Sequence, residues 1–163
     1  TMDVLDQSPS GSETVTQEYL TFKLGSEEYG IDILKVQEIR GYERPTRLSH
    51  APEYIKGVVN LRGTIVPIVD MRLRLGCTHV NYSSFTVVIV LHLKQRVVGM
   101  VVDSVSDVVQ LQRQHIKPAP DVDSVIDDAS VLGLGALGER MLILLDIEHV
   151  MAGLDMGLTR VSV

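Results

Sequence analysis

The chain has 163 residues, of which 45% are apolar and only seven are aromatic, five Tyr and two Phe without any Trp. This length fits one domain, or two very small ones that share a core. Its 15 Lys and Arg against 21 Asp and Glu give a net charge of −6, which argues against nucleic-acid binding and against a basic membrane-surface helix, because both concentrate positive charge.

The apolar residues favour β-structure. The chain contains 24 Val and 11 Ile, whose branched side chains are stiff and pack well on a pleated sheet. The single Cys77 cannot form an intramolecular disulfide, which fits a reducing cytosol. Neither a secretory signal nor an apolar run longer than five residues is present. We therefore expect a cytoplasmic protein without direct membrane insertion.

The chain opens with a segment that has no apolar period. Residues 1–16 are rich in Ser, Thr, Asp and Glu, and we expect a disordered tail there. Apolar residues then alternate over residues 20–24, which is typical of a half-buried strand. Residues 25–28 are interpreted as a turn, and residues 29–33 return as a second strand.

The sequence also contains an internal repeat. A shift of 69 positions, and a shift of 76 further along, place residues of the first half on similar residues of the second half. Chance coincidence explains this less well than duplication, because Gly and Asp positions agree as well as apolar ones. Among the matched pairs are Gly30 with Gly99, Val36 with Val105, Glu38 with Asp107, Ile39 with Val108, Gly57 with Gly133, Ile65 with Met141, and Asp70 with Asp146.

The repeat predicts two intertwined all-β units, residues 17–83 and 84–152. Small barrels are favoured over open sheets because closure removes exposed strand edges, and units of this size need a shared seam to be stable. Short helices are expected at residues 70–76 and 146–153, each with an N-terminal Asp cap and a C-terminal Gly. Both Asp residues are interpreted as caps rather than catalysts. Residues 153–163 are expected to form a flexible tail.

A glycine motif at residues 133–138 satisfies the G-x-G-x-x-G pattern of dinucleotide-binding sites. Such a site needs a helix after the glycines, whose N-terminal amides bind the pyrophosphate. Here residues 141–145 are typical of a strand, and the motif matches residues 57–63 in the repeat. We interpret it as a loop in which glycine permits positive φ or close backbone approach. A nucleotide-binding enzyme remains the alternative.

Other candidate catalytic and metal sites are incomplete. The five histidines lack the spacing of metal ligands. Cys77 and His79 have neither a third ligand nor an orienting acid. The carboxylate pair of Glu27 and Glu28 falls in the predicted turn, where charge is solvated, and not in a cleft that raises one pKa. We therefore expect no metal, no cofactor and no enzymatic activity.

Three segments carry more Val and Ile than one buried face requires, namely residues 34–39, 85–90 and 101–109. One interpretation is a strand buried on both faces between the barrels. The other is an apolar groove that accepts a partner helix. Arg62, in a glycine-flanked loop, is either a surface arginine bonded to its own loop or a rim cation that pairs with a partner's carboxylate.

Four blocks carry a resemblance to a known family: residues 27–41, 55–70, 96–108 and 133–146. In this order they closely resemble the CheW family of bacterial chemotaxis coupling proteins, over roughly residues 17–152. The resemblance implies a mostly β fold of two five-stranded Src-homology-3-like barrels around a common hydrophobic core. Short helices, including one at the C-terminal end, complete this fold, which agrees with the internal repeat.

The resemblance also implies a non-enzymatic adaptor. Members of the family bridge the cytoplasmic tips of chemoreceptors, the methyl-accepting chemotaxis proteins, to the histidine kinase CheA. The regulatory domain of CheA resembles the family itself, and the two alternate in rings, with other family copies as further partners, so that membrane-associated receptor arrays form. The alternative is a coupling domain of a larger signalling protein; the expected disordered start and irregular end favour a complete small protein.

The resemblance places two binding surfaces on this chain. A groove between the barrels takes the helical hairpin of the receptor: apolar members accept its apolar side chains, and charged members set the register, which favours specificity more than affinity. The matching receptor positions are Ile33, Val36, Glu38, Ile39, Arg62, Thr86, Val87, Val88, Gly99, Val105 and Val108. The kinase contact matches Lys117, Pro118 and Val122. Where relatives carry Arg and Phe, this chain has Lys117 and Val122, and Lys lacks the bidentate fork of Arg.

Overall fold

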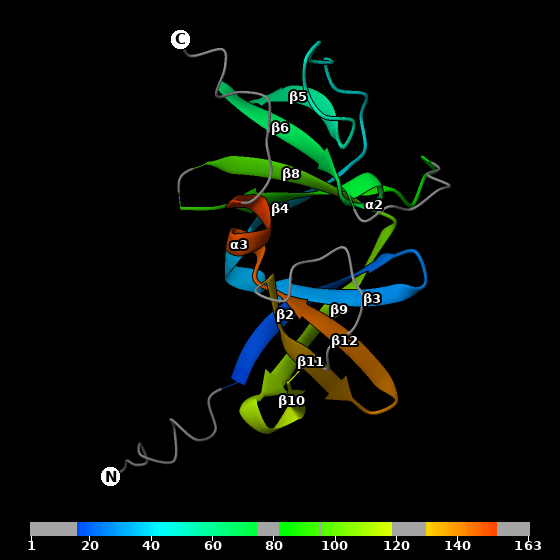
Figure 1. Cartoon of the computed structure of the whole chain (residues 1–163), viewed down its shortest axis with the longest axis vertical. Helices are drawn as coiled ribbons and strands as arrows, with labels where there is room; N and C mark the ends of the chain where they lie inside the picture. The colour runs from blue at the N-terminus through cyan, green and yellow to red at the C-terminus, as the bar shows by residue number, and fades with distance from the viewer. Residues whose placement is uncertain (1–15, 75–81, 95, 119–129, 153–163) are drawn as a thin grey trace.

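The computed structural model describes residues 16–74, 82–94, 96–118 and 130–152 (Figure 1). The predicted tails therefore lie outside the described residues apart from Thr16, and so do Cys77 and His79. None of the helices in the described ranges is long and apolar enough to cross a membrane. The strands are β2 (Thr16–Leu24), β3 (Glu27–Asp32), β4 (Val36–Gly41), β5 (Ile55–Leu61), β6 (Thr64–Asp70), β7 (Val87–His92), β8 (Val97–Val102), β9 (Ser104–Gln112), β10 (Ile116–Lys117), β11 (Val131–Leu137) and β12 (Arg140–Leu145). The helical segments are η1 (Ile33–Lys35), α2 (Met71–Arg74), η2 (Arg113–His115) and α3 (Ile147–Ala152).

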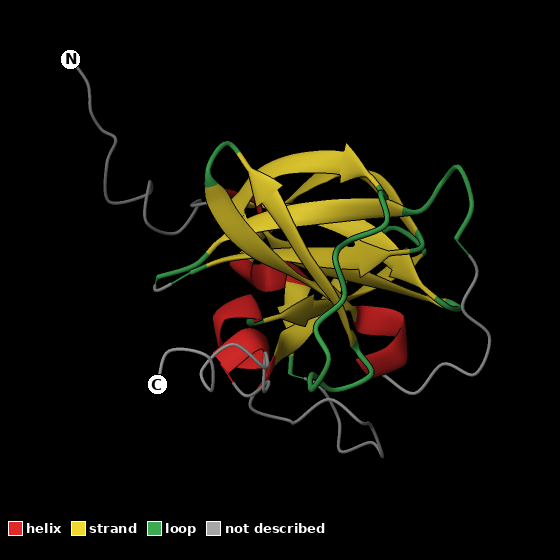
Figure 2. Cartoon of the chain, turned by 90° about the horizontal axis from the view of Figure 1, so that it is seen from above, coloured by secondary structure: helices red, strands yellow, loops and turns green. Residues whose placement is uncertain are grey.

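The strands form two curved sheets that stack along the long axis of the molecule (Figures 1 and 2). One has five strands in the order β4-β7-β8-β6-β5, and the other has six in the order β10-β11-β12-β3-β2-β9. Helix α3 lies at the level where the two sheets meet (Figure 1). The expectation of a mostly β fold of two small barrels with a few short helices is confirmed.

The internal repeat is visible in the element order, but the sheets do not divide the chain at residues 83 and 84. Elements β2 to β6 and α2 correspond under the two shifts to β7, β8, β9, β11, β12 and α3. The first hairpin of each repeat joins the sheet of the other: β2 and β3 lie in the six-stranded sheet, and β7 and β8 lie in the five-stranded sheet. Each exchanged hairpin is attached by one parallel pairing, β3 with β12 or β8 with β6, and by one antiparallel pairing, β2 with β9 or β7 with β4.

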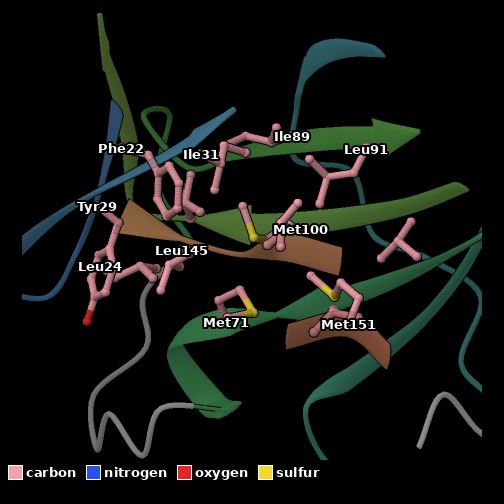
Figure 3. Close-up of a cluster of buried hydrophobic side chains, with 14 of the residues drawn as sticks. Phe22, Leu24, Tyr29, Ile31, Met71, Ile89, Leu91, Met100, Leu145 and Met151 are labelled. Carbon is pink, nitrogen blue, oxygen red and sulfur yellow. The ribbon is translucent and has the colours of Figure 1, made fainter. Parts of the chain in front are cut away.

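The exchange creates one core shared by both sheets (Figure 3). Phe22 and Ile31 of the six-stranded sheet belong to the same buried cluster as Ile89 and Met100 of the five-stranded sheet. Met151 of α3 closes the cluster and is 1% exposed. Strand β7 is buried on both faces, since four successive side chains from position 88 to 91 are all buried. Within the segment 85–90, residues 88–90 fit the first interpretation, a strand buried on both faces, whereas Phe85 is 74% exposed.

One turn assignment from the sequence is wrong. Glu27 and Glu28 belong to β3, and the turn before them is limited to Gly25, with φ of 63°, and Ser26. The sequence misplaced the strand start because two adjacent carboxylates favour a solvated turn, whereas Glu28 is held by an ion pair with Arg140.

The glycine motif is a strand rather than a loop. Gly133 and Gly135 lie in β11, and only Gly138, with φ of 63°, lies in the following turn. A Cβ on Gly135 would lie 2.7 Å from Cδ1 of Leu111, so this glycine allows β11 to pack closely against β9. Strand β12 follows directly, so no helix N-terminus faces the glycines, and the geometry required for a dinucleotide site is not present in this motif.

The predicted aspartate caps are confirmed. Oδ1 of Asp70 accepts a hydrogen bond from the backbone N–H of Arg72 at 2.9 Å. Oδ1 of Asp146 accepts from the N–H of His149 at 3.3 Å. Each carboxylate thus satisfies a backbone donor at the start of a helix, which is the role that such residues play at helix N-termini.

A buried ion-pair network connects the two sheets beside α2. Arg72, 3% exposed, donates from Nη2 to Oδ2 of the buried Asp70 at 3.0 Å and from Nη1 to Oδ1 of Asp103 at 2.9 Å. Asp103 links β8 to β9, and its Oδ2 accepts from the N–H of Gly25 at 2.7 Å. Tyr82 donates its hydroxyl to Oδ2 of Asp70 at 2.5 Å, and burial raises the pKa of this tyrosine. The network therefore ties the five-stranded sheet to the β2–β3 turn.

The substitution Arg72→Met is expected to lower the free energy of unfolding by about 3 kcal/mol, because it leaves the buried Asp70 carboxylate without its cation. Urea unfolding followed by circular dichroism measures this change. The double variant Asp70→Asn with Arg72→Met is the control and should lose less, since no uncompensated buried charge remains. An unchanged midpoint for Arg72→Met would show that the network does not stabilise the fold.

Candidate partner-binding surface

Two strands, β4 and β9, contain four of the apolar residues predicted to bind a receptor, and both strands are bulged at this point. In β4 the register shifts between Val36, opposite Leu91, and Glu38, opposite Val90. In β9 it shifts between Val105, opposite Phe22, and Val108, opposite Leu20. Each bulge inserts one extra residue, which bends the strand and redirects its side chains. We call Val36, Ile39, Val105 and Val108 the bulge surface.

The bulge surface presents apolar side chains that the core does not fully cover. Ile39 is 45% exposed and Val108 is 48% exposed. Val36 and Val105 are partly buried and pack against the core cluster shared by the two sheets. The predicted residues Ile33 and Val87 are likewise partly buried against this cluster. The surface is therefore fixed to the core on one side and accessible on the other.

Three predicted receptor residues lie in the interior instead. Thr86 is 2% exposed, and its Oγ1 accepts from the N–H of Ser83 at 2.9 Å. Val88 is 6% exposed. A Cβ on Gly99 would lie 2.6 Å from Cδ1 of Ile68 and 2.9 Å from Cγ1 of Val88. Val88 and Ile68 belong to a buried cluster of the five-stranded sheet that is separate from the cluster against which Val36 and Val105 pack.

The charged members of the predicted set form an ion pair with each other. Arg62, with φ of 52° in the β5–β6 turn, donates from Nη2 to Oε1 of Glu38, and Arg40 donates to Oε2 at 3.2 Å. Hydrogen bonds from Arg62, and then from Arg40, hold the pKa of Glu38 below its usual value. Because β4 and β5 are the two ends of the five-stranded sheet, this pair joins its edges.

Within the chain, Arg62 thus pairs with Glu38 and not with its own loop. Its loop is stabilised separately by Asn60, whose Oδ1 accepts from the N–H of Gly63 at 2.8 Å. The Arg62 side chain remains 67% exposed, so its remaining donors face solvent beside the bulge surface. Both interpretations from the sequence missed Glu38, which lies far from Arg62 along the chain.

A second ion pair, which the sequence-based interpretation did not include, lies beside the β9 bulge. Arg140 at the start of β12 donates from Nη2 to Oδ1 of Asp107 at 2.9 Å and to Oε2 of Glu28 at 2.7 Å. Hydrogen bonds from Arg140, and then from Thr21, lower the pKa of Asp107. The repeat gave a signal for this pair, because Asp107 matches Glu38.

The predicted kinase-binding residues lie elsewhere. Lys117, on β10, and Pro118 are exposed. Strand β10 pairs with β11 and ends the six-stranded order opposite to β9. Val122 lies outside the described residues. The two predicted surfaces therefore occupy different strands of the fold.

The described residues offer little for catalysis. In the ranges that the structure describes, no three His, Cys, Asp or Glu side chains are grouped as a metal site requires. Ser130 Oγ lies 2.8 Å from Nδ1 of His149, but the nearby Asp146 carboxylate bonds to the backbone N–H of that histidine. A nucleophile dyad needs an acid that orients the histidine ring, which this carboxylate does not do.

The family model and the similar known proteins all indicate the same family. The family model described as CheW-like domain matches residues 18–154. "Chemotaxis protein CheW" of Klebsiella aerogenes is 56% identical over 151 residues, which cover 93% of this chain and 91% of that protein. "Chemotaxis protein CheW" of Rhizobium meliloti is 39% identical over 134 residues, which cover 82% and 86%.

A solved structure agrees. The crystal structure of the scaffolding protein TtCheW from Thermoanaerobacter tengcongensis superimposes with a TM-score of 0.75 at 30% identity, over 83% of this chain and 88% of that one. These relatives are named as chemotaxis and scaffolding proteins and not as enzymes. The chain belongs to the CheW-like family of chemotaxis coupling proteins.

Proposed function

We propose that this chain couples the cytoplasmic tips of chemoreceptors to the histidine kinase CheA and helps to build receptor–kinase arrays. The observation that carries the proposal is the match to the CheW-like family over residues 18–154. The adaptor works in the cytoplasm and is recruited to membrane-associated arrays by its partners. It needs no cofactor, because its output is the relative position of two other proteins.

The bulge surface supports the receptor contact. A helical hairpin presents apolar side chains at intervals of three or four residues, which suits a surface of separate apolar projections such as Ile39 and Val108. The exposed donors of Arg62 lie at its margin and can pair with a carboxylate on the receptor. Such a rim charge sets the register of the helix more than its affinity.

The exposed Lys117 and Pro118 support a separate kinase contact. Because these residues lie on and after β10, whereas the bulge surface lies on β4 and β9, one molecule can hold both partners at once. The regulatory domain of CheA and further copies of the family occupy this second surface in the proposed rings. Lys117 contributes a point charge there, without the bidentate geometry of Arg.

The direct test is reconstitution of kinase regulation. CheA is mixed with chemoreceptors in lipid nanodiscs, with and without the protein, and transfer of labelled phosphate to the kinase is followed. We expect kinase activity to depend on the receptor only when the protein is present. Receptor-independent activity in both mixtures would contradict the proposed coupling.

The two-surface arrangement gives a separate prediction. Val108→Gln is expected to weaken binding of a receptor cytoplasmic fragment about tenfold and to leave binding of the CheA regulatory domain unchanged, because an exposed apolar contact is replaced by a polar one. Lys117→Ala should have the opposite pattern. Isothermal titration calorimetry with each partner measures both effects.

The matched control is Leu132→Gln on β11, since Leu132 is 53% exposed and lies outside the bulge surface. It should bind the receptor fragment as the parent does. If Val108→Gln remained folded and lost both partners equally, separate surfaces for receptor and kinase would be ruled out.

A further inference from the structure

We propose that Arg140 is a positioning residue for receptor binding: through Asp107 it holds the β9 half of the bulge surface, as Arg62 holds the β4 half through Glu38. This inference rests on the proposed receptor contact and extends it to two residues, Asp107 and Arg140, that the resemblance did not indicate.

The bulge in β9 breaks the regular ladder beside Val108. Between Phe22 opposite Val105 and Leu20 opposite Val108, only Thr21 faces the two residues at positions 106 and 107. Ladder hydrogen bonds are lost at such a point, and other groups must replace them. The conformation of residues 105–108 therefore depends on side-chain hydrogen bonds as well as on the backbone ladder.

Thr21 supplies the replacement bonds. Its Oγ1 accepts from the backbone N–H of Asp107 at 3.1 Å. The same hydroxyl lies 2.5 Å from Oδ1 and 3.0 Å from the backbone O of Asp107, and it donates its single proton to one of these oxygens. Because Thr21 is fully buried, the bulged backbone is fixed to the interior at this one residue.

Arg140 holds the carboxylate from the other side. Its Nη1 donates to Oδ2 of Asp107 at 3.1 Å and its Nη2 to Oδ1 at 2.9 Å, a bidentate geometry. The same guanidinium donates to Glu28, from Nε at 3.3 Å and from Nη2 at 2.7 Å. Arg140 thus connects β9 to β12 and β3. All three strands belong to the six-stranded sheet, in which β12 and β3 are neighbours. The paired guanidinium limits rotation of the Asp107 side chain, and so of the bulge.

Three positions in each half of the bulge surface match under the repeat, whereas the paired arginines do not, since the shift of 76 places Arg62 on Gly138. Val36, Glu38 and Ile39 match Val105, Asp107 and Val108 by the shift of 69 positions. In both halves the acidic residue lies at a bulge, and the arginine that pairs with it comes from the hairpin that joins two later strands. The outermost apolar residues are also exposed to nearly the same extent, 45% for Ile39 and 48% for Val108. The same construction thus occurs twice, once in each sheet, and Val36 and Val105 both pack against the cluster that the two sheets share.

The consequence is a specific role for Arg140. Without it, the Asp107 carboxylate loses both guanidinium bonds and turns to solvent, and the bulge keeps only the Thr21 contacts. Val105 and Val108, on either side of Asp107, then sample more positions, so receptor binding has to order them. Arg140 makes no apolar contact with a receptor helix in this scheme; it acts by fixing the backbone that presents the valines.

Four proteins test this: the parent, Arg140→Gln, Asp107→Asn and the double variant. Binding of a receptor cytoplasmic fragment is measured by calorimetry, and binding of the CheA regulatory domain is measured in parallel. Each single substitution should weaken receptor binding about fivefold, and the double variant should lose no more than either single one, because both remove the same ion pair. Kinase binding should stay unchanged.

Two further variants separate positioning from general destabilisation. Arg140→Lys keeps the charge without the fork and should recover part of the affinity. Arg47→Gln, an exposed arginine of the five-stranded half, is the matched control and should bind the receptor as the parent does. Should Arg140→Gln fail to fold, Asp107→Asn, which preserves side-chain shape, carries the same test.

The amide signals of Val105 and Val108 in the free protein provide a readout that needs no partner. Arg140→Gln should shift and broaden both signals in a nitrogen–proton NMR spectrum and leave those of Val36 and Ile39 in place. If the parent binds the receptor fragment and Arg140→Gln binds it equally well, the positioning role is wrong. A parent that binds no receptor fragment would instead contradict the proposed function, and the NMR shifts would still decide whether Arg140 fixes the bulge.

Discussion

The fold depends on one constraint, the exchange of the first hairpin between two repeats. Strands β2 and β3 complete the sheet of the second repeat, and β7 and β8 complete that of the first. Each sheet therefore lacks its central strands without the other repeat, and neither has a complete core alone. The shared cluster around Phe22 and Met100 follows directly, as does the burial of β7 on both faces. The buried Arg72 network then fixes the sheets where the exchanged segments cross.

The same exchange explains where a partner can bind. Exposed apolar residues lie on several strands, among them Ile65 and Met141 in regular pairing, whereas those of the bulge surface lie where strands depart from it. Strands β4 and β9 are the end strands that follow the exchanged hairpins, and each is bulged. A bulge turns side chains outward at the cost of ladder hydrogen bonds. The ion pairs of Glu38 with Arg62 and of Asp107 with Arg140 stabilise these places by side-chain contacts.

The sequence predicts the fold well because the determining signals are local or repeated. Alternating apolar residues, glycine turns and the Asp70 and Asp146 caps each act within a few positions. The shifts of 69 and 76 align the elements of the two repeats correctly. Hairpin exchange was not predicted, because strand pairing across repeats depends on packing that leaves no local pattern. Gly133 and Gly135 were assigned to a loop because the contacts that require glycine there, Gly133 with Lys117 on β10 and Gly135 with Leu111 on β9, involve residues remote in sequence.

The candidate site was only partly predictable. Exposed positions such as Ile39 and Val108 were identified by resemblance, yet Thr86, Val88 and Gly99 from the same set are buried. A family comparison transfers positions without distinguishing contact residues from those that support them. Arg140 was missed because its partners Asp107 and Glu28 are remote in sequence.

The acidic residues of the two halves, Glu38 and Asp107, are each paired with an arginine. This pairing sets the pH range over which both ion pairs exist. Arg62 holds the pKa of Glu38 below its usual value, and Arg140 does the same for Asp107. A carboxyl group whose pKa is lowered by folding contributes stability above its unfolded-state pKa and loses it as the pH falls through the folded-state value. Both carboxylates are therefore ionised throughout the neutral range, and both bulges keep their ion pairs there.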